Sequence, residues 1–381
     1  MKLSIERAEL LKALGHVQSV VERRNTIPIL SNVLLSASES GLALTATDLD
    51  IEIVESAHAD IKSPGEITAP AHTLYDIARK LPDGAEVSLA TDGSNKGDDR
   101  LSVEAGRSSF ALPLLPPGDF PQMTADGFSH EFDLPASDLR RLIDKTRFAI
   151  STEETRYYLN GIYLHAQPGD TDADGKSGDR LRAVATDGHR LALAKVTLPA
   201  GASGMPGIIV PRKTVTEIRR LVDTLEGDVH VQLSESKIRF SFAGAQLTSK
   251  LIDGNFPDYE RVIPKSNPKR LVLDNKVFNA AVDRVATISQ EKSRSIKMSL
   301  TENALALAVN TPEAGRASED LMVDYEGEPL EIGFNARYIM DVAAQIEGRD
   351  ATYHLADPAS PALVRDSEDA ESLFVLMPLR V

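Results

Sequence analysis

Apolar residues recur at helical spacing in six runs of this 381-residue chain. Within each run they follow one another at intervals of three or four, as on one face of an α-helix. The runs form a first and a second helix three times in succession, at residues 8–21, 70–81, 136–150, 211–225, 275–288 and 335–346. The pattern therefore predicts three pairs of helices in a fixed order.

Between the two helices of each pair lies a strand-like stretch that contains one polar turn. The turns occupy equivalent places, at Thr47-Asp48, Thr186-Asp187 and Asn310-Thr311. Equivalent points are roughly 125 to 140 residues apart, which is the length of an ordinary domain and far longer than a solenoid repeat. We therefore expect three similar domains, at residues 1–126, 127–265 and 266–381.

The strand-like segments are short and alternate apolar with polar residues, as in VHVQLS from Val229 and KIRFSF from Lys237. Such alternation is typical of antiparallel sheets with one face toward solvent. With about eight such segments and two helices in each repeat, the predicted class is α+β. The joints between domains are expected near residues 122–129 and 264–268, where glycine, proline and polar residues cluster.

Composition narrows the class of protein. Hydrophobic residues make up 42% of the chain, which is enough for several cores, and no run of about 18 apolar residues exists. Because Glu6 and Arg7 precede any apolar run, a signal peptide is not predicted. The lack of cysteine excludes disulfides and thiolate metal sites. We therefore expect a cytoplasmic protein without membrane attachment.

The net charge of −15 argues at first against a nucleic-acid partner. The predicted helices, however, together carry about +6, which leaves about −21 for the rest of the chain. A basic helical face could hold DNA phosphates, so we expect DNA contacts at Arg140, Arg141, Lys213 and Arg220. For any single helix, the alternative is a solvated face stabilised by charge pairs four residues apart.

Two segments imitate sites of known chemistry. Asp170, Asp172 and Asp174 resemble the start of an EF-hand calcium loop, but the position that needs glutamate is Leu181. Residues 186–190 (TDGHR) gather an acid, a histidine and an arginine, yet no nucleophile or metal motif accompanies them. We therefore expect no metal, no cofactor and no enzymatic activity.

Two other functional classes stay open on the residues alone. A hydrolase or isomerase that uses His189 is disfavoured because the sequence indicates no partner residue for it. A scaffold protein built of repeated domains would leave the basic helices unexplained.

Several strings carry a resemblance to a known family: IPILSNVLL (27–35), RYYLNGIYL (156–164), VATDGHRLAL (184–193), LIDGNFPDYERVIP (251–264) and MPLR (377–380). They closely resemble strings of the bacterial DNA polymerase III beta subunits, the replicative sliding clamps, and occur in the same order. The resemblance covers residues 1–381, and the acidic insertion at residues 168–179 is the main departure from it.

The resemblance implies three clamp domains per chain and a head-to-tail homodimer that closes a six-domain ring around double-stranded DNA. Such a ring is a processivity factor, which tethers the polymerase without chemistry of its own. The implied partners are the DNA polymerase III alpha subunit, the clamp loader complex, other DNA polymerases, ligase and mismatch-repair proteins.

The resemblance also implies a hydrophobic groove that binds short peptides of these partners. Its residues carry over as Leu159, Thr186, Gly188, His189, Arg190, Leu191, Pro257, Arg261, Val262, Asn335, Tyr338, Val375, Met377, Pro378 and Leu379. Ala359 and Pro361 replace residues that the family often has as an aliphatic residue and a serine, so peptide affinity is expected to differ in detail. For Leu191 and Val375, ordinary packing between domains is nearly as good an interpretation.

Two further sets of residues follow from the resemblance. The ring joint is expected to pair Phe110 and Leu112 of the first domain with Val277 and Phe278 of the third. DNA contacts are expected at Arg24, Tyr157 and Tyr158, in addition to the four residues that the charge argument selects.

Overall fold

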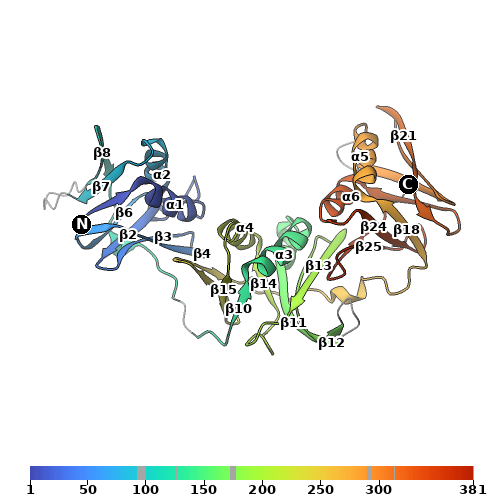
Figure 1. Cartoon of the computed structure of the whole chain (residues 1–381), viewed down its shortest axis with the longest axis horizontal. Coiled ribbons are helices and arrows are strands. Elements are labelled where there is room, and N and C mark those ends of the chain that lie inside the picture. Colours follow the sequence, from blue (N-terminus) through green and yellow to red (C-terminus); the bar gives the residue numbers. More distant parts are fainter. Residues whose placement is uncertain (92–99, 125–126, 172–176, 290–293, 313, 381) are drawn as a thin grey trace. The chain divides into compact units, whose positions relative to one another are not determined.

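The computed structural model describes six stretches of the chain: residues 1–91, 100–124, 127–171, 177–289, 294–312 and 314–380 (Figure 1). Most of the EF-hand-like segment, at residues 172–176, lies outside them. Leu181, at its critical position, lies in a strand. No helix in the described stretches is long and apolar enough to span a membrane.

The described residues form three repeats with a shared element order, except that the described part of the second repeat has one strand fewer between its two α-helices (Figure 1). The first contains β1 (Lys2–Glu6), α1 (Arg7–Val17), the 3-10 helix η1 (Pro28–Ser31), β2 (Asn32–Ser38), β3 (Gly41–Thr47), β4 (Ile51–Ala57), β5 (Asp60–Ser63), β6 (Gly65–Pro70), α2 (Ala71–Lys80), β7 (Glu86–Thr91), β8 (Arg100–Ala105), β9 (Ser108–Pro113) and η2 (Pro117–Asp119). The second contains β10 (His130–Pro135), α3 (Ala136–Thr146), η3 (Arg147–Ala149), η4 (Glu154–Leu159), β11 (Gly161–Thr171), β12 (Ser177–Thr186), β13 (Arg190–Thr197), β14 (Ile208–Pro211), α4 (Arg212–Leu221), β15 (Asp228–Leu233), β16 (Lys237–Phe242), β17 (Ala245–Lys250) and η5 (Tyr259–Arg261). The third contains β18 (Lys269–Asp274), α5 (Asn275–Ala286), β19 (Ser295–Thr301), β20 (Ala304–Thr311), β21 (Gly315–Met322), β22 (Asp324–Tyr325), β23 (Leu330–Asn335), α6 (Ala336–Ala343), β24 (Asp350–Leu355), β25 (Ala362–Asp366) and β26 (Ser372–Leu376).

All six predicted helices are confirmed, although each one ends earlier than its apolar pattern suggested. After α3, for example, residues 147–149 form a 3-10 turn instead of a further α-helical turn. Beyond α5 and α6, the Ser289 and Gln345 amides donate to carbonyls only three residues back. The apolar spacing continues through these tighter turns, so sequence periodicity overestimates the length of the α-helix.

The described strands form antiparallel sheets, and two of these sheets join neighbouring repeats. One compact unit, Met1–Ala136 with Thr216–Leu251, holds a five-stranded sheet in the order β5-β1-β7-β8-β9 and an eight-stranded sheet in the order β10-β15-β16-β17-β4-β3-β2-β6. The other unit, Ser137–Val215 with Ile252–Val381, holds a nine-stranded sheet in the order β14-β11-β12-β13-β26-β25-β24-β18-β22 and a four-stranded sheet in the order β21-β20-β19-β23. The second repeat is therefore divided between the two units.

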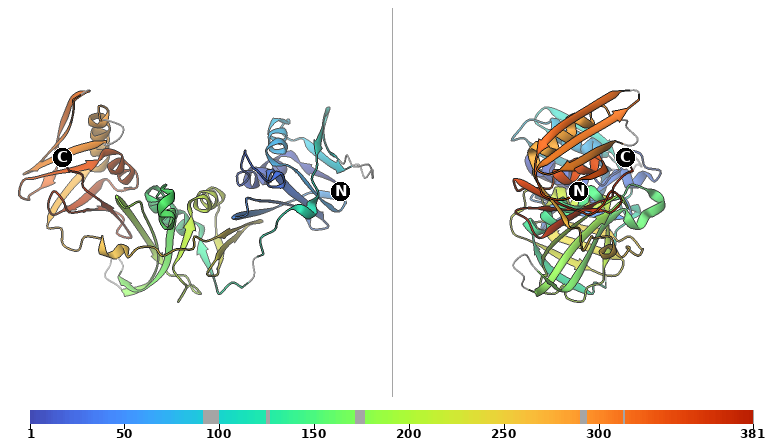
Figure 2. Two further views of the ribbon diagram at one scale, coloured as in Figure 1. Left: turned by 180° about the vertical axis from the view of Figure 1, so that it is seen from behind. Right: turned by 90° about the vertical axis from the view of Figure 1, so that its right-hand side faces the viewer.

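The cores follow from the alternation in the strands and the apolar face of the helices. In β20, Leu305, Leu307 and Val309 are buried while the residues between them are partly exposed. In α1, Leu10, Leu14 and Val17 form the buried stripe. Figure 2 shows α5 and α6 side by side against the strands of the third repeat.

Candidate functional site

The turn between β12 and β13 is held by its own side chains. Thr186 Oγ1 accepts the Gly188 amide at 3.1 Å, and Asp187 Oδ1 accepts the amides of His189 and Arg190 at 2.9 and 3.0 Å. Gly188 has a φ of +87°, which favours glycine because a Cβ is strained there. The geometry fixes the backbone of the predicted groove wall.

Arg190 is buried rather than presented at the surface. Its guanidinium pairs with Asp187 at 3.2 Å and with Asp341 of α6, and it donates to the Phe148 carbonyl at 2.7 Å. It also lies over the Tyr338 ring, 4.4 Å from its centroid. Arg190 thus ties the β12–β13 turn to α6, and its partners Asp341 and Phe148 were not selected from the sequence.

Aromatic residues continue this wall. The His189 ring stacks with the Tyr338 ring, with a centroid distance of 6.2 Å. Burial raises the pKa of the Tyr338 hydroxyl, so this ring is uncharged at neutral pH. Asn335 caps α6, because its Oδ1 accepts the Arg337 amide at 2.9 Å.

The floor beneath the wall is apolar and buried. Leu191 and Val375 lie opposite each other in the β13–β26 ladder and belong to one hydrophobic cluster with Leu363 and Tyr259. Leu159 is also buried. Leu191 and Val375 thus pack between strands of two repeats, and their part in a peptide groove stays a prediction.

The rim, by contrast, is exposed. Met377 is 37% exposed and Val262 is 46% exposed. The other predicted rim residues divide into an exposed set, Pro257, Arg261 and Gly188, and a half-buried set, Thr186, Pro378 and Leu379.

Backbone hydrogen bonds hold the C-terminal segment beside the turn. The Met377 amide donates to the His189 carbonyl at 2.9 Å, and the Leu379 amide donates to the Gly333 carbonyl at 2.8 Å. A flexible thioether over an apolar floor suits varied peptide side chains.

The β4–β17 junction in the other unit is equivalent in backbone but different in chemistry. There the Lys250 amide donates to the Asp50 carbonyl at 2.9 Å, which matches the bond from Met377 to His189. Counting from these bonds, the pair equivalent to Leu191 and Val375 is Glu52 and Thr248. Its floor is therefore polar, and Glu52 accepts the Met123 amide at 2.9 Å.

Models of three protein domains match consecutive parts of the chain. They are described as the N-terminal, central and C-terminal domains of the DNA polymerase III beta subunit, and they match residues 1–124, 133–258 and 260–380. The chain belongs to the DNA polymerase III beta subunit family. The resemblance stated from the sequence is thereby confirmed.

Relatives and solved structures of this family match along the full length. The beta sliding clamp of Caulobacter vibrioides is 61% identical and that of Escherichia coli K12 is 38% identical, each over 100% of both chains. A crystal structure of the Caulobacter crescentus beta sliding clamp is 60% identical with a TM-score of 0.95, and it covers 100% of this chain and 99% of that one. A sliding clamp from Bartonella birtlesii bound to griselimycin is 49% identical, with a TM-score of 0.95 and 100% coverage of both chains. The predicted fold of three repeated clamp domains is thus confirmed.

The residues that family resemblance selects for DNA contacts lie at the surface. Arg24 is exposed, and so is Tyr157, whose ring meets the half-buried Tyr158 ring edge-on at 5.8 Å. Arg140, selected by the charge argument, is half-buried. Arg140 and Lys213 each already take part in an interaction.

Two basic residues selected by charge turn out to hold the protein together. Arg141 donates to the Lys195 carbonyl at 2.9 Å and pairs with Asp369 at 2.5 Å. Arg220 donates to the carbonyls of Gly15 and His16, both at 2.7 Å, at the end of α1. Helix-terminal carbonyls and carboxylates compete with phosphate for a guanidinium, so these contacts count against the two arginines as DNA ligands, and their assignment stays a prediction.

The residues predicted for the ring joint separate into two classes. Phe110 and Val277 are exposed, but Leu112 is buried and Phe278 is only 1% exposed. The Phe278 ring lies in the core of its own domain, edge-on to Tyr353 at 5.7 Å. Because Phe278 is already buried within its own domain whereas Val277 is exposed, the prediction of Phe278 as a contact residue is corrected and Val277 stays a candidate.

Proposed function

We propose that this chain is a DNA polymerase processivity factor: a sliding clamp that encircles duplex DNA and tethers the replicative polymerase. Similarity over the full length to proteins named beta sliding clamps supports this function. The observation that carries it is a property of the sheets: two junctions between repeats are closed within the chain, and two edge strands remain open for a third.

The closed junctions follow one rule. At the first, β4 of repeat one pairs with β17, the last strand of repeat two. At the second, β13 of repeat two pairs with β26, the last strand of repeat three. Continuing the rule, β21 of repeat three should pair with β9 of repeat one, and both are edge strands of their sheets. They belong to the two ends of the chain, so a second copy supplies the partner head to tail.

The repeats also predict the register of this third junction. The bridges of Leu115 to Thr68 and of Leu379 to Gly333 are equivalent, which aligns β9 with β26. The pairing of Asn310 with Arg316 is equivalent to that of Thr186 with Leu191, which aligns β21 with β13.

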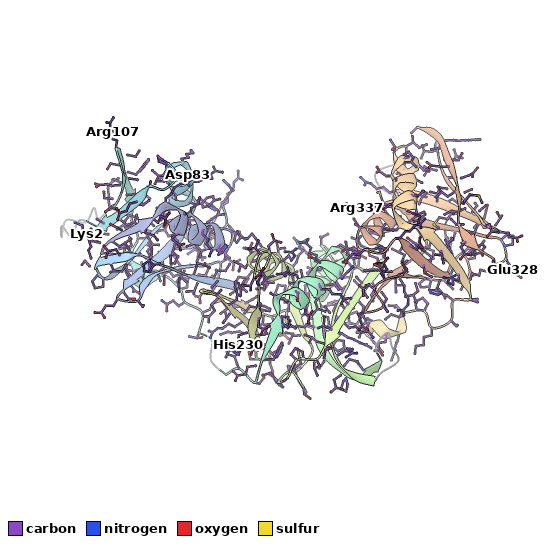
Figure 3. The ribbon with its side chains drawn as sticks, in the orientation of Figure 1. Lys2, Asp83, Arg107, His230, Glu328 and Arg337 are labelled. Carbon is purple, nitrogen blue, oxygen red and sulfur yellow. The ribbon has the colours of Figure 1, made fainter. Side chains whose placement is uncertain are left out.

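The aligned strands place particular residues opposite each other. Phe110 of one copy then faces Ala317 of the other, as Phe374 faces Ala192 within the chain. Arg107, at the tip of the β8–β9 hairpin (Figure 3), faces Asp320. Exposed Phe110 is buried by this pairing, and two open sheet edges are removed.

In the ring, the exposed Arg24 and Tyr157 are proposed to meet the DNA backbone. Weak phosphate contacts without base readout suit a protein that must slide, because such contacts do not depend on sequence. Arg140 and Lys213 remain proposals on the charge argument alone. The contacts of Arg141 and Arg220 within the chain count against them as members of this set.

The groove around Met377 is proposed to bind short peptides of the partner proteins. Among the two closed junctions only β13–β26 has an apolar pair at the floor position, which supports one groove in each chain. We propose the DNA polymerase III alpha subunit as its first occupant. The clamp loader, other DNA polymerases, ligase and mismatch-repair proteins are proposed to bind the same groove in turn.

The experiment that tests the function is retention on DNA. The protein is loaded by its clamp loader onto nicked circular DNA, the loader and ATP are removed, and the circle is then cut. We expect retention on the circle and loss after cutting, because a ring leaves only over an end. Equal retention on circular and linear DNA would contradict encirclement.

A further inference from the structure

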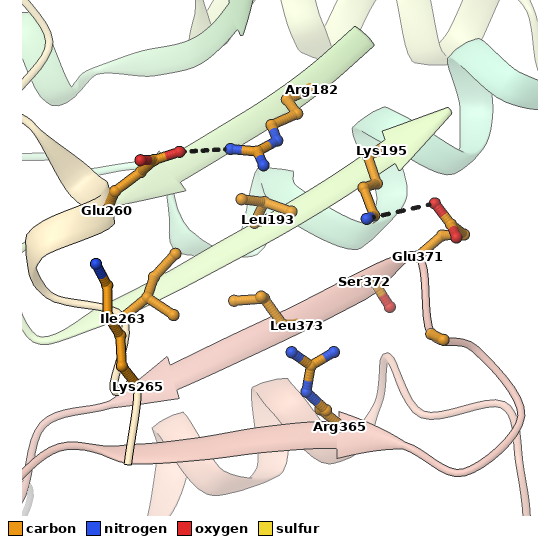
Figure 4. Close-up of a pocket in the computed structure, with 11 residues that line it drawn as sticks. Arg182, Leu193, Lys195, Glu260, Ile263, Lys265, Arg365, Glu371, Ser372 and Leu373 are labelled. Carbon is orange, nitrogen blue, oxygen red and sulfur yellow. Dashed lines mark hydrogen bonds and ion pairs between the residues drawn. The ribbon is translucent and has the colours of Figure 1, made fainter. Parts of the chain in front are cut away.

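A cavity of about 340 Å³ opens on the sheet formed by β12, β13, β26 and β25 (Figure 4). Its lining consists of Arg182, Leu193, Lys195, Glu260, Ile263, Lys265, Arg365, Ala370, Glu371, Ser372 and Leu373. None of the groove residues named above is among them. The cavity is therefore a second candidate site in the same compact unit.

The floor of the cavity is apolar. Leu193 and Leu373 face each other across the β13–β26 ladder, and Ile263 covers them from the connector that leads into β18 (Figure 4). These three residues pack in the cluster that also contains Leu191 and Val375. One apolar cluster thus lies beneath both the groove and the cavity.

The charges at the rim do not balance. Arg182 donates to Glu260 at 2.8 Å, and Lys195 lies 3.9 Å from Glu371. Lys265 and Arg365 complete the rim, and no carboxylate of the described stretches pairs with either of them. The cavity therefore has two surplus positive charges in a chain whose net charge is −15.

The wall toward the connector is held rigidly. Arg182 also donates to the Tyr259 hydroxyl at 2.8 Å, and this hydroxyl is hydrogen-bonded to His165 Nε2 at 3.0 Å. Beside them, the Tyr163 and Phe256 rings stack in parallel at 4.8 Å. A cavity whose wall is fixed in advance loses little entropy when a ligand enters.

We propose that this cavity binds an acidic residue and the apolar residue next to it, from an extended segment of a partner protein. The apolar side chain would cover Leu193 and Leu373, and the carboxylate would pair with Arg365 and Lys265. That the segment belongs to a partner of the clamp rests on the function proposed above. Binding to the cavity requires only a carboxylate and a neighbouring apolar side chain, whichever protein supplies them.

A protein carboxylate fits the cavity better than a nucleic acid does. Glu260 and Glu371 stand at the same rim and repel a chain of phosphates, while a single carboxylate needs only the two surplus cations. No aromatic ring lines the cavity in the described part of the chain, so bases have no surface on which to stack.

The cavity and the groove share strands β13 and β26, so a single partner segment that binds both sites gains affinity from their proximity. A partner segment that places its motif in the groove and an acidic flank in the cavity binds the second site intramolecularly. Each contact alone can then be weak while the pair is tight. Partners with an acidic and apolar flank are expected to be preferred over partners without one.

The test uses the full chain with ¹³C-labelled Leu, Ile and Met methyl groups, and the peptide acetyl-Glu-Leu-Glu-amide as ligand. We expect saturable NMR shifts at Leu193, Leu373 and Ile263. The variant K265Q/R365Q should weaken this binding by about tenfold. The matched control R23Q/K62Q, which removes two exposed cations of the other compact unit, should leave it unchanged.

Four outcomes would overturn the proposal: no saturable shift, equal shifts with acetyl-Gln-Leu-Gln-amide, unchanged binding to K265Q/R365Q, or stronger shifts of the same methyls with hexathymidylate. Shifts confined to Met377 would place the peptide in the groove and also overturn it. The variant M377A/L379A separates the two sites. It should retain the cavity shifts whether or not the groove assignment is correct.

Discussion

At the scale of single residues, one cross-strand position distinguishes the two junctions inside the chain. Leu191 and Val375 make an apolar floor at the second junction, whereas Glu52 and Thr248 occupy the same place at the first. The backbone bonds around the two positions are the same. Apolar side chains of a peptide gain free energy by covering apolar surface, so this side-chain pair supports the proposal that partners bind at the second junction.

The double variant Met377→Ala, Leu379→Ala should weaken binding of the DNA polymerase III alpha subunit by at least about tenfold, since central apolar contacts dominate peptide interfaces. Surface plasmon resonance with the immobilised clamp measures this loss. Lys250→Ala, at the position equivalent to Met377, is the matched control and should bind normally. Unchanged polymerase binding in the double variant would refute the groove assignment.

Glu52→Gln should raise the thermal stability of the protein at alkaline pH more than at acidic pH. Burial raises the pKa of the Glu52 carboxyl above its usual 4.5, although the Met123 amide and the cations Arg239 and Lys237 oppose this. The folded state therefore holds this proton more tightly than the unfolded state does. The wild type loses stability as the pH rises from 4.5 through the folded pKa, and the amide removes that loss.

Differential scanning fluorimetry from pH 4 to pH 9 measures the difference between variant and wild type. Glu131→Gln removes the same charge from an exposed position and controls for the change in net charge. A difference that stays constant or shrinks with rising pH would contradict the burial argument.

At the scale of elements, the open edges β9 and β21 are the part of the fold that a single chain leaves incomplete. Residues of β21 are exposed or half-exposed along the whole strand, and Met322 is 87% exposed. Edges of this kind invite pairing with another chain. At the two junctions inside the chain, β4 pairs with β17 and β13 pairs with β26, so the backbone groups of those strands are hydrogen-bonded across repeats.

Reversing one charge at the proposed β9–β21 joint should weaken the dimer, and reversing both should restore it. Arg107→Glu or Asp320→Arg alone places like charges opposite each other, at a cost of roughly 1 kcal/mol in each of two joints. The double variant pairs opposite charges again. Analytical ultracentrifugation over a concentration series measures the dimer, and equally weak dimers in the double and single variants would refute the register.

At the scale of the whole molecule, the charge of −15 and a role on DNA are compatible because charge is distributed by position. The basic residues fall into two groups: those whose side chains pair within the fold, and those whose exposed side chains are candidates for contact with phosphate. Arg141, Arg220 and the buried Lys145, whose ammonium pairs with Glu347 at 2.8 Å, belong to the first group. Arg24 remains a candidate for the second.

Arg24→Gln should lower the affinity of the dimer for DNA and flatten its salt dependence. Removing one phosphate contact reduces the slope of log K against log salt by about one for each copy that touches DNA. Fluorescence anisotropy with a labelled duplex at several salt concentrations measures both quantities. Arg141→Gln, whose guanidinium is held by Asp369, should leave the slope unchanged, and an unaltered slope for Arg24→Gln would remove it from the DNA surface.

The sequence by itself determined the elements and their order, because apolar spacing and turn chemistry are local properties of the chain. The six helices and the turn after Thr186 illustrate this, and the family strings could be read for the same reason. Helix ends were misplaced, since 3-10 turns continue the same apolar spacing. The domain limits at residues 126 and 265 stay a prediction.

Only the tertiary structure decided what individual side chains do, because their partners come from distant segments. Phe278 and Val277 are neighbours in sequence, yet packing against Tyr353 buries one and leaves the other exposed. Arg141 and Arg220 have the charge to bind DNA, but a carboxylate and helix-end carbonyls occupy them. The cavity beside Lys265 and Arg365 exists only where a connector crosses two strands from different repeats. Periodicity records which face of an element is buried, whereas folding selects the group that each polar atom meets.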